Sequence, residues 1–377
     1  MSYNMTNVLG LLFANTHEDS VPELAAKRTI ASIPFGGRFR MVDFLLSGMS
    51  NSGMSKVGVI TRSNYQSLLD HIGSARPWDL ARNDGGLTLL APFGRSSHTG
   101  LFKGKLDALS SCLSYIRHTG CEYVVLSDCD LVINPDFAHL IDVHIESGAD
   151  ITAVSHTDNY TEEETRDAAC FKVGSSGRVE AVAINRAMSG KRTMDLNIYA
   201  MKTSLLVSLV EDLVSLGKFS FSTDVLQGKV HELNIHAYEF SGFYRRICDL
   251  ESYYKANMAL LDYNNLSQLI LRERPVYTKD RADAPAKYGF DSTVKNSMVA
   301  NGCVIEGVVE NSILFRGVKI EKGAVVKNSI LMQDTVVGKD ACVSNIVTDK
   351  NVTIGDGVSV ISAESCPLYI SKGRTVK

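Results

Sequence analysis

The chain has 377 residues and a formal net charge of −3, with 45% hydrophobic and 21% charged residues. This balance is typical of a soluble globular protein and argues against a general binder of nucleic acids or membrane surfaces. The length favours two domains, and eight scattered cysteines without a C-x-x-C pair indicate reduced thiols in a cytoplasmic protein.

In chain order, the first predicted element is an apolar strand over residues 8–13, followed by a polar segment over 15–20. In a nucleotide-binding fold such a strand leads into glycines, because backbone N–H groups must approach the phosphates without an intervening Cβ. Segment 15–20 contains no glycine, and the carboxylates of Glu18 and Asp19 would repel a triphosphate. We therefore expect that this loop does not cradle nucleotide phosphates.

Apolar strands then alternate with amphipathic helical patterns through the first two-thirds of the chain. We expect buried strands over 57–61, 123–127 and 151–155, and helices over 106–116, 137–146 and 205–216. This alternation predicts an α/β domain with a mostly parallel sheet covered on both faces. Ligands bind such sheets at the carboxyl ends of the strands, and Asp128 and Asp130 lie at one of these ends.

From about residue 263 the pattern changes to a helical stretch, a polar connector and then a period of six. One apolar line at this spacing contains Val318, Ala324, Ile330, Val336, Cys342, Thr348, Ile354 and Val360. A second line contains Val325, Leu331, Val337 and Val343. Hexapeptide periodicity of this kind is typical of a parallel β-helix. We expect an α/β domain over 1–262, a linker over 263–290 and a β-helix over 291–377, an architecture that favours oligomerisation.

Several longer motifs make this domain pairing more specific. They are Pro34–Phe44, Asn51–Gly53, Gly58–Thr61, His71–Gly73, Pro77–Leu80, Glu122–Leu126 and Tyr253–Asn257. Over nearly its whole length the chain resembles the glucose-1-phosphate adenylyltransferase (ADP-glucose pyrophosphorylase) family. These enzymes make ADP-glucose from ATP and glucose 1-phosphate for bacterial glycogen synthesis. The resemblance implies a Rossmann-like nucleotidyltransferase domain followed by a left-handed parallel β-helix of hexapeptide repeats.

Within this resemblance, the positions implied to bind the nucleotide are altered. Asn15, Thr16 and Glu18 stand where the family has glycines that cradle the ATP phosphates. Ile30 stands in place of a lysine that serves the same phosphates. Its aliphatic side chain offers a phosphate neither a charge nor a hydrogen-bond donor.

The implied metal and sugar-phosphate positions are altered as well. Asp130 matches one metal-binding aspartate of the family, whereas Arg246 stands where the second carboxylate would be and its charge repels Mg²⁺. Ala183 and Ile184 replace the glutamate and lysine that grip glucose 1-phosphate. We therefore interpret Asp130 as a vestigial ligand and the other positions as degraded catalytic sites. We expect a partly collapsed, less polar cleft.

Four cations near the N-terminus match places where the family binds its effectors through basic residues. They are Lys27, Arg28, Arg38 and Arg40. They predict a site for a phosphorylated effector if the fold brings them together. A solvated basic face is the alternative interpretation.

These departures predict a catalytically degraded regulatory subunit of a glucose-1-phosphate adenylyltransferase in bacterial glycogen biosynthesis. We expect a hetero-tetramer with a catalytic subunit, no cofactor of its own, and Mg²⁺ only in that partner. Two alternatives stay open. The chain could be an active enzyme that uses Asp130 with Asp107 or Asp128, or a sensor that binds a sugar phosphate or nucleotide without chemistry.

Overall fold

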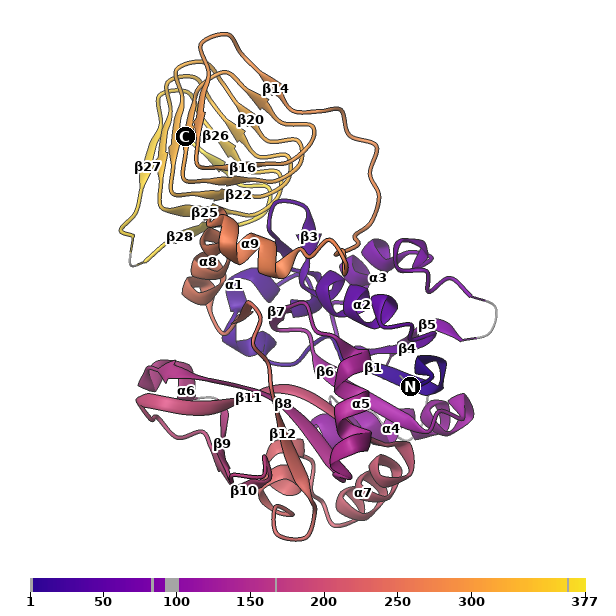
Figure 1. Ribbon diagram of the computed structural model, residues 1–377. Helices are drawn as coiled ribbons and strands as arrows, with labels where there is room; N and C mark the ends of the chain where they lie inside the picture. Colours follow the sequence, from indigo (N-terminus) through magenta and orange to yellow (C-terminus); the bar gives the residue numbers. More distant parts are fainter. Residues whose placement is uncertain (1–2, 83–84, 92–101, 167, 365) are drawn as a thin grey trace.

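The computed structural model describes residues 3–82, 85–91, 102–166, 168–364 and 366–377. Figure 1 shows an N-terminal α/β domain with a stack of short parallel strands at one end, formed by the C-terminal part of the chain. Within the described part of the chain, no helix is long and apolar enough to cross a membrane.

Four parallel strands form one half of the central sheet. β1 (Val8–Phe13) lies between β6 (Tyr123–Asp128) and β4 (Lys56–Ile60), and β5 (Gly86–Leu90) pairs with the outer side of β4. Every residue of β1 and β6 is buried, as expected for strands covered on both faces. The predicted strands over 8–13, 57–61 and 123–127 are confirmed to within one residue at each end.

Helices cover both faces of this sheet. α2 (Met41–Asn51) and α5 (Phe137–Ser147) pack in one apolar core, and α4 (Lys105–Thr119) and α7 (Thr203–Ser215) pack in the other. The three helices predicted from the apolar period are present, with ends within three residues of the predicted ones. Asp136 caps the start of α5, and the left-handed residues Gly120 and Gly148 end α4 and α5, which apolar periodicity does not report.

The other half of the sheet contains antiparallel strands. β11 (Gly190–Lys202) pairs antiparallel with β6, β8 (Ile151–Tyr160) and β9 (Ala169–Val173), and β9 pairs antiparallel with β10 (Val179–Ile184). β12 (Ile235–Glu239) runs parallel to β8. The sheet is therefore mixed in its strand directions, whereas the sequence predicted a mostly parallel one. Short connections between β9, β10 and β11 permit only antiparallel neighbours.

Smaller elements complete the α/β domain and lead into the C-terminal part. They are α1 (Pro22–Ala25), β2 (Pro34–Phe35), β3 (Phe39–Arg40), α3 (Gln66–Ile72), β7 (Leu131–Ile133), α6 (Glu162–Arg166), η6 (Phe221–Gln227), β13 (Tyr244–Arg246), α8 (Leu250–Met258) and α9 (Tyr263–Leu269). A connector without regular structure spans residues 271–286.

Three parallel sheets form the β-helix. The first contains β14 (Lys287–Tyr288), β17 (Val304–Ile305), β20 (Lys319–Ile320), β23 (Val336–Val337), β26 (Thr353–Ile354) and β29 (Thr375–Val376). The second contains β15 (Thr293–Lys295), β18 (Val308–Glu310), β21 (Val325–Lys327), β24 (Cys342–Ser344) and β27 (Ser359–Ile361). The third contains β16 (Met298–Val299), β19 (Ile313–Leu314), β22 (Ile330–Leu331), β25 (Ile346–Thr348) and β28 (Leu368–Ile370).

The β-helix is confirmed, but its central coils repeat after 17 residues instead of 18. Ser329 contacts Ser312 in the coil before it, 17 positions earlier, and Val326 pairs with Val343 in the same register. Residues spaced exactly six apart therefore move by one position in each successive coil, relative to the three sides of the β-helix. As a result, Val336 is half-buried while its neighbour Val337 is fully buried, although Ile354 of the first line is again fully buried.

Left-handed residues at the corners explain how so short a coil closes. Asn311, Asn328 and Asn345 occupy equivalent corners with φ of 46°, 45° and 56°. Asparagine tolerates this conformation because its short polar side chain hydrogen-bonds locally.

The two domains share apolar and ionic contacts. Phe315 and Met332 of the β-helix belong to the same apolar core as Phe35 of the α/β domain. The buried side chains of Arg28 and Asp349 form an ion pair across this boundary at 2.5 Å. The boundary is therefore built like a protein interior, which holds the domains in one arrangement.

Candidate functional site

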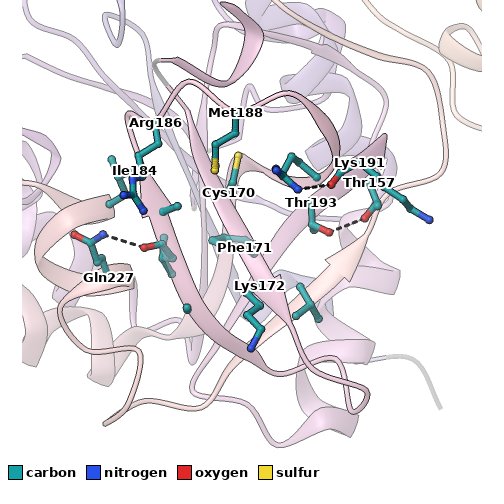
Figure 2. Close-up of a pocket in the computed structure, with 15 residues that line it drawn as sticks. Thr157, Cys170, Phe171, Lys172, Ile184, Arg186, Met188, Lys191, Thr193 and Gln227 are labelled. Carbon is teal, nitrogen blue, oxygen red and sulfur yellow. Dashed lines mark hydrogen bonds between the residues drawn. The ribbon is translucent and has the colours of Figure 1, made fainter. Parts of the chain in front are cut away.

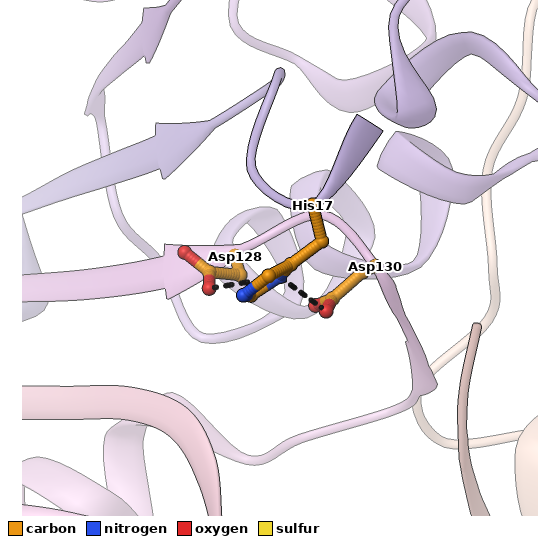
Figure 3. Close-up of side chains that lie close together, drawn as sticks. All are labelled: His17, Asp128 and Asp130. Carbon is orange, nitrogen blue, oxygen red and sulfur yellow. Dashed lines mark hydrogen bonds and ion pairs between the residues drawn. The ribbon is translucent and has the colours of Figure 1, made fainter. Parts of the chain in front are cut away.

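The carboxyl ends of β1 and β6 lie at one edge of the central sheet, next to the separate two-stranded sheet of β7 and β13. Asp128 ends β6, Asp130 follows it, and Arg246 ends β13, which pairs with the short strand β7 just after Asp130. His17 lies in the segment after β1 and points between the two carboxylates (Figure 3). Parallel strands thus bring residues from distant parts of the chain into one cluster, as predicted for a site at this edge.

Protein cations already contact both carboxylates. Arg246 Nε lies 3.0 Å from Asp130 Oδ2, and Lys105 Nζ lies 2.8 Å from Asp128 Oδ2. His17 Nδ1 lies 2.9 Å from Asp130 Oδ2 and 4.0 Å from Asp128 Oδ2. Both aspartates are completely buried. Each carboxylate of the cluster is therefore paired with a protein cation.

The titration of Asp130 reflects this pairing. Burial alone would raise the pKa of Asp130, but the charge of Arg246 and the hydrogen bond from His17 outweigh burial and hold the pKa below its usual range. Burial likewise would lower the pKa of Arg246, and the charge of Asp130 raises it instead. The pair is ionised at neutral pH.

The loop after β1 is held by its own polar groups. Asn15 Nδ2 donates to Glu18 Oε1 at 2.5 Å and to the Ser63 carbonyl at 3.0 Å, and Asn15 Oδ1 accepts from the Arg62 N–H at 2.7 Å. Burial raises the pKa of Glu18 to about 7, although the hydrogen bond from Asn15 opposes the shift. The side chains of Asn15 and Glu18 are therefore bonded within the protein.

The remaining altered positions differ in their surroundings. Ile30 is fully buried in the core below the loop, so the cleft is filled there as expected. Ala183 and Ile184 on β10 instead line an open cavity of about 760 Å³, which is the opposite of a collapsed cleft.

The four predicted effector cations do not share one environment. Arg38 and Arg40 line a cleft of about 200 Å³ between the α/β domain and the β-helix. Lys27 is exposed outside the lining of this cleft, and Arg28 is buried against Asp349. Arg38 and Arg40 thus lie in the cleft, Lys27 lies on the surface, and Arg28 belongs to a structural ion pair.

Four further cations line the same cleft as Arg38 and Arg40. They are Lys279, Arg281, Arg316 and Lys350, and Asp280 is the single acidic residue among the described residues that line it. We call these six basic residues the cationic cleft. Burial and the nearby charges of Arg40 and Arg28 lower the pKa of Lys350 to about 7. These four residues were not predicted from the sequence, because they lie in the connector and the β-helix, far along the chain from Arg40.

Comparison with known proteins places these features in a family. A family model described as "Nucleotidyl transferase" matches residues 23–263, and one described as "GlmU-like, C-terminal hexapeptide" matches residues 284–364. The chain is 34% identical to "Glycogen biosynthesis protein GlgD" of Bacillus subtilis (strain 168) over 84% of its length and 81% of that protein. It is 32% identical to "Glucose-1-phosphate adenylyltransferase" of Geobacillus stearothermophilus over 84% of its length and 82% of that protein.

The chain belongs to the glucose-1-phosphate adenylyltransferase family. A GlgD protein of Geobacillus stearothermophilus is 35% identical over 84% of this chain and 82% of its own length. Because nucleotidyl transfer uses Mg²⁺, this is the ion that a member of the family would hold at the carboxylate cluster.

The cluster does not fit Mg²⁺ well. In the described part of the chain, His17, Asp128 and Asp130 are the group whose ligand atoms lie close enough for one ion, all within 4.8 Å of one another. A divalent cation bound there would add two charges beside Arg246 and Lys105, which already neutralise the carboxylates. Asp107, the other candidate ligand, accepts the Lys103 backbone N–H at the start of α4 at 2.9 Å and is outside this group.

The sequence analysis did not assign His17 and Lys105 to the site. Their signals were weak, since one lies in the glycine-free loop and the other precedes a predicted helix by one residue. Only the folded sheet shows that both reach Asp128.

Proposed function

We propose that this chain is a regulatory subunit of a glucose-1-phosphate adenylyltransferase in glycogen biosynthesis. In this role it forms no ADP-glucose by itself and requires no cofactor, and Mg²⁺ acts only in a catalytic partner subunit. It assembles with that partner into a hetero-tetramer in the cytoplasm. The names of its relatives support the pathway, and the geometry of the carboxylate cluster supports the absence of catalysis.

The observation that carries the proposal is the pairing of Asp130 with Arg246 and of Asp128 with Lys105. Nucleotidyl transfer needs carboxylates that are available to hold a cation against the phosphates. In this chain both carboxylates are buried and charge-balanced by side chains. Ile30 and the loop around Asn15, whose side chain bonds within the protein, lack the lysine and the glycines that the family resemblance assigns to the nucleotide phosphates.

Regulation in this proposal acts through the cationic cleft. A phosphorylated small molecule bound by Arg38 and Arg40 of the α/β domain and by Arg316 and Lys350 of the β-helix would contact both domains at once. Such a ligand favours one conformation of this subunit. The interface with the catalytic partner passes this preference on, with a coupling free energy of roughly 1–3 kcal/mol.

The test compares ADP-glucose formation by this chain, by a purified catalytic homologue, and by the two co-expressed. We expect no turnover by this chain alone and an altered saturation curve for ATP or glucose 1-phosphate in the mixture. Identical kinetics of the homologue with and without this chain would contradict regulation. Clear turnover by the isolated chain would instead support an active enzyme with a different metal geometry.

A further inference from the structure

We propose that the cavity beside β10 binds an organic phosphate with an apolar or aromatic body. The cavity lies among β8, β9, β10, β11 and the short helix η6 and encloses about 760 Å³ (Figure 2). This volume is within the range of small-molecule sites. Its lining includes Ala183 and Ile184, the altered sugar-phosphate positions, but no residue of the carboxylate cluster or the cationic cleft.

The charges around the cavity specify an anion. Four basic side chains line it, namely Lys172, Arg186, Lys191 and Arg192, and no acidic residue does so among the described residues. Lys172 pairs with Glu180 at 2.9 Å. The other three form no ion pair with any residue in the described part of the chain. This excess of positive charge is local, because the whole chain carries a net charge of −3.

Two of these residues are arginines, which favours a phosphate. A guanidinium presents a planar fork of N–H donors that matches two phosphate oxygens, whereas an ammonium acts as a point charge. Arg186 and Arg192 are both exposed, so they retain the freedom to turn toward a ligand. Arg186 lies in the connection from β10 to β11, and Arg192 lies near the start of β11.

The neutral polar groups of the cavity are already bonded to protein atoms. The Thr157 and Thr193 hydroxyls lie 2.9 Å apart, and Gln227 Nε2 donates to the Val182 carbonyl at 2.9 Å (Figure 2). A ligand rich in hydroxyl groups would therefore find few partners beyond the cations. This arrangement disfavours a sugar as the body of the ligand.

Apolar side chains form the rest of the surface. Val182 and Phe171 are buried in the floor, and Ile184 and Met188 are partly buried along the side. Two hydrogen bonds with the Thr165 hydroxyl, at 2.8 and 2.9 Å, fix the Met188 backbone. Its flexible thioether side chain can adapt to an aromatic or aliphatic group.

The proposal is tested by calorimetric titration of the full chain with 1-naphthyl phosphate, glucose 1-phosphate and inorganic phosphate. We expect 1-naphthyl phosphate to bind at least about tenfold more tightly than the other two. The double variant Arg186→Gln/Arg192→Gln should weaken its binding by about tenfold or more. Both residues are exposed, so the variant should fold normally.

A matched control locates the effect. Lys218→Gln removes an exposed cation elsewhere and should bind 1-naphthyl phosphate like the parent chain. Equal affinity for inorganic phosphate or glucose 1-phosphate would overturn the apolar selectivity. Unchanged binding in Arg186→Gln/Arg192→Gln would overturn the location. Neither result depends on a catalytic partner, so a failure of this proposal would not count against the proposed regulatory function.

Discussion

The carboxylate cluster and the cationic cleft are both rich in charge, and they differ in how that charge is compensated. In the cluster, Asp128 and Asp130 are buried and each contacts a protein cation. In the cleft, six basic residues line one space; Asp280 is the one acidic residue among the described lining residues, and Asp283 lies 2.9 Å from Arg281 and 3.8 Å from Arg316, which leaves an excess of positive charge. Balanced buried charge stabilises a fold, whereas unbalanced charge at a cleft attracts a ligand. We therefore propose that the charges of the carboxylate cluster are structural and that the charges of the cationic cleft serve a ligand.

The largest effect on the free energy of unfolding is expected when one carboxylate of the cluster is removed. Asp130→Ala leaves the guanidinium of Arg246 buried without its partner and should lower the free energy of unfolding by about 3–5 kcal/mol. Adding Arg246→Met should recover at least half of this loss. Denaturant titration followed by circular dichroism measures both values.

A surface pair provides the control for that loss. Glu211→Ala breaks a half-exposed ion pair with Arg117 and should change the free energy of unfolding by less than about 1 kcal/mol. If Asp130→Ala lowered the free energy of unfolding as little as Glu211→Ala, the pair of Asp130 and Arg246 would not stabilise the fold.

A smaller effect is expected on anion binding at the cationic cleft. Arg40→Gln or Arg316→Gln should each weaken sulfate binding by about tenfold, because each removes a charge from a partly enclosed site. Lys27→Gln is the matched control, since Lys27 is exposed outside the lining of the cleft. Calorimetry with sulfate measures the three affinities. Equal losses in all three variants would indicate a diffuse basic face.

The smallest expected effect is a pH dependence. Burial, together with Arg40 and Arg28, lowers the pKa of Lys350 to about 7. Lysine is charged below its pKa, so sulfate affinity should fall by about threefold between roughly pH 6 and pH 8. Sulfate itself does not titrate in this range, and burial lowers the pKa of His71, which limits its contribution. Lys350→Gln should abolish the dependence, and an unchanged pH profile in that variant would assign it to another group.

The sequence predicted the elements that depend on local periodicity. Strand β6 and the position of Asp130 after it follow from a short apolar run ended by aspartates, and the β-helix follows from recurring aliphatic residues. The loss of one residue per coil was not visible from a period of six, because it depends on how tightly the asparagine corners turn.

Contacts between distant residues could not be predicted from the sequence. Arg28 matched a basic effector position, but its partner Asp349 lies 321 residues away and only the docking of the β-helix brings them together. The same docking adds Arg316 and Lys350 to the cleft. Lys105 reaches Asp128 only because α4 begins beside the end of β6. Long-range packing decides which of several similar cations is structural and which faces a ligand.

The most direct test of the central claim is a titration of the isolated chain with Mn²⁺, followed by electron paramagnetic resonance. Our account predicts that the parent chain binds Mn²⁺ no more tightly than about 1 mM, because Arg246 and Lys105 already neutralise Asp130 and Asp128. The double variant Arg246→Ala/Lys105→Ala should gain a stoichiometric site of micromolar affinity. A single tight Mn²⁺ site in the parent chain would contradict the account, because the carboxylates would then be available to a metal.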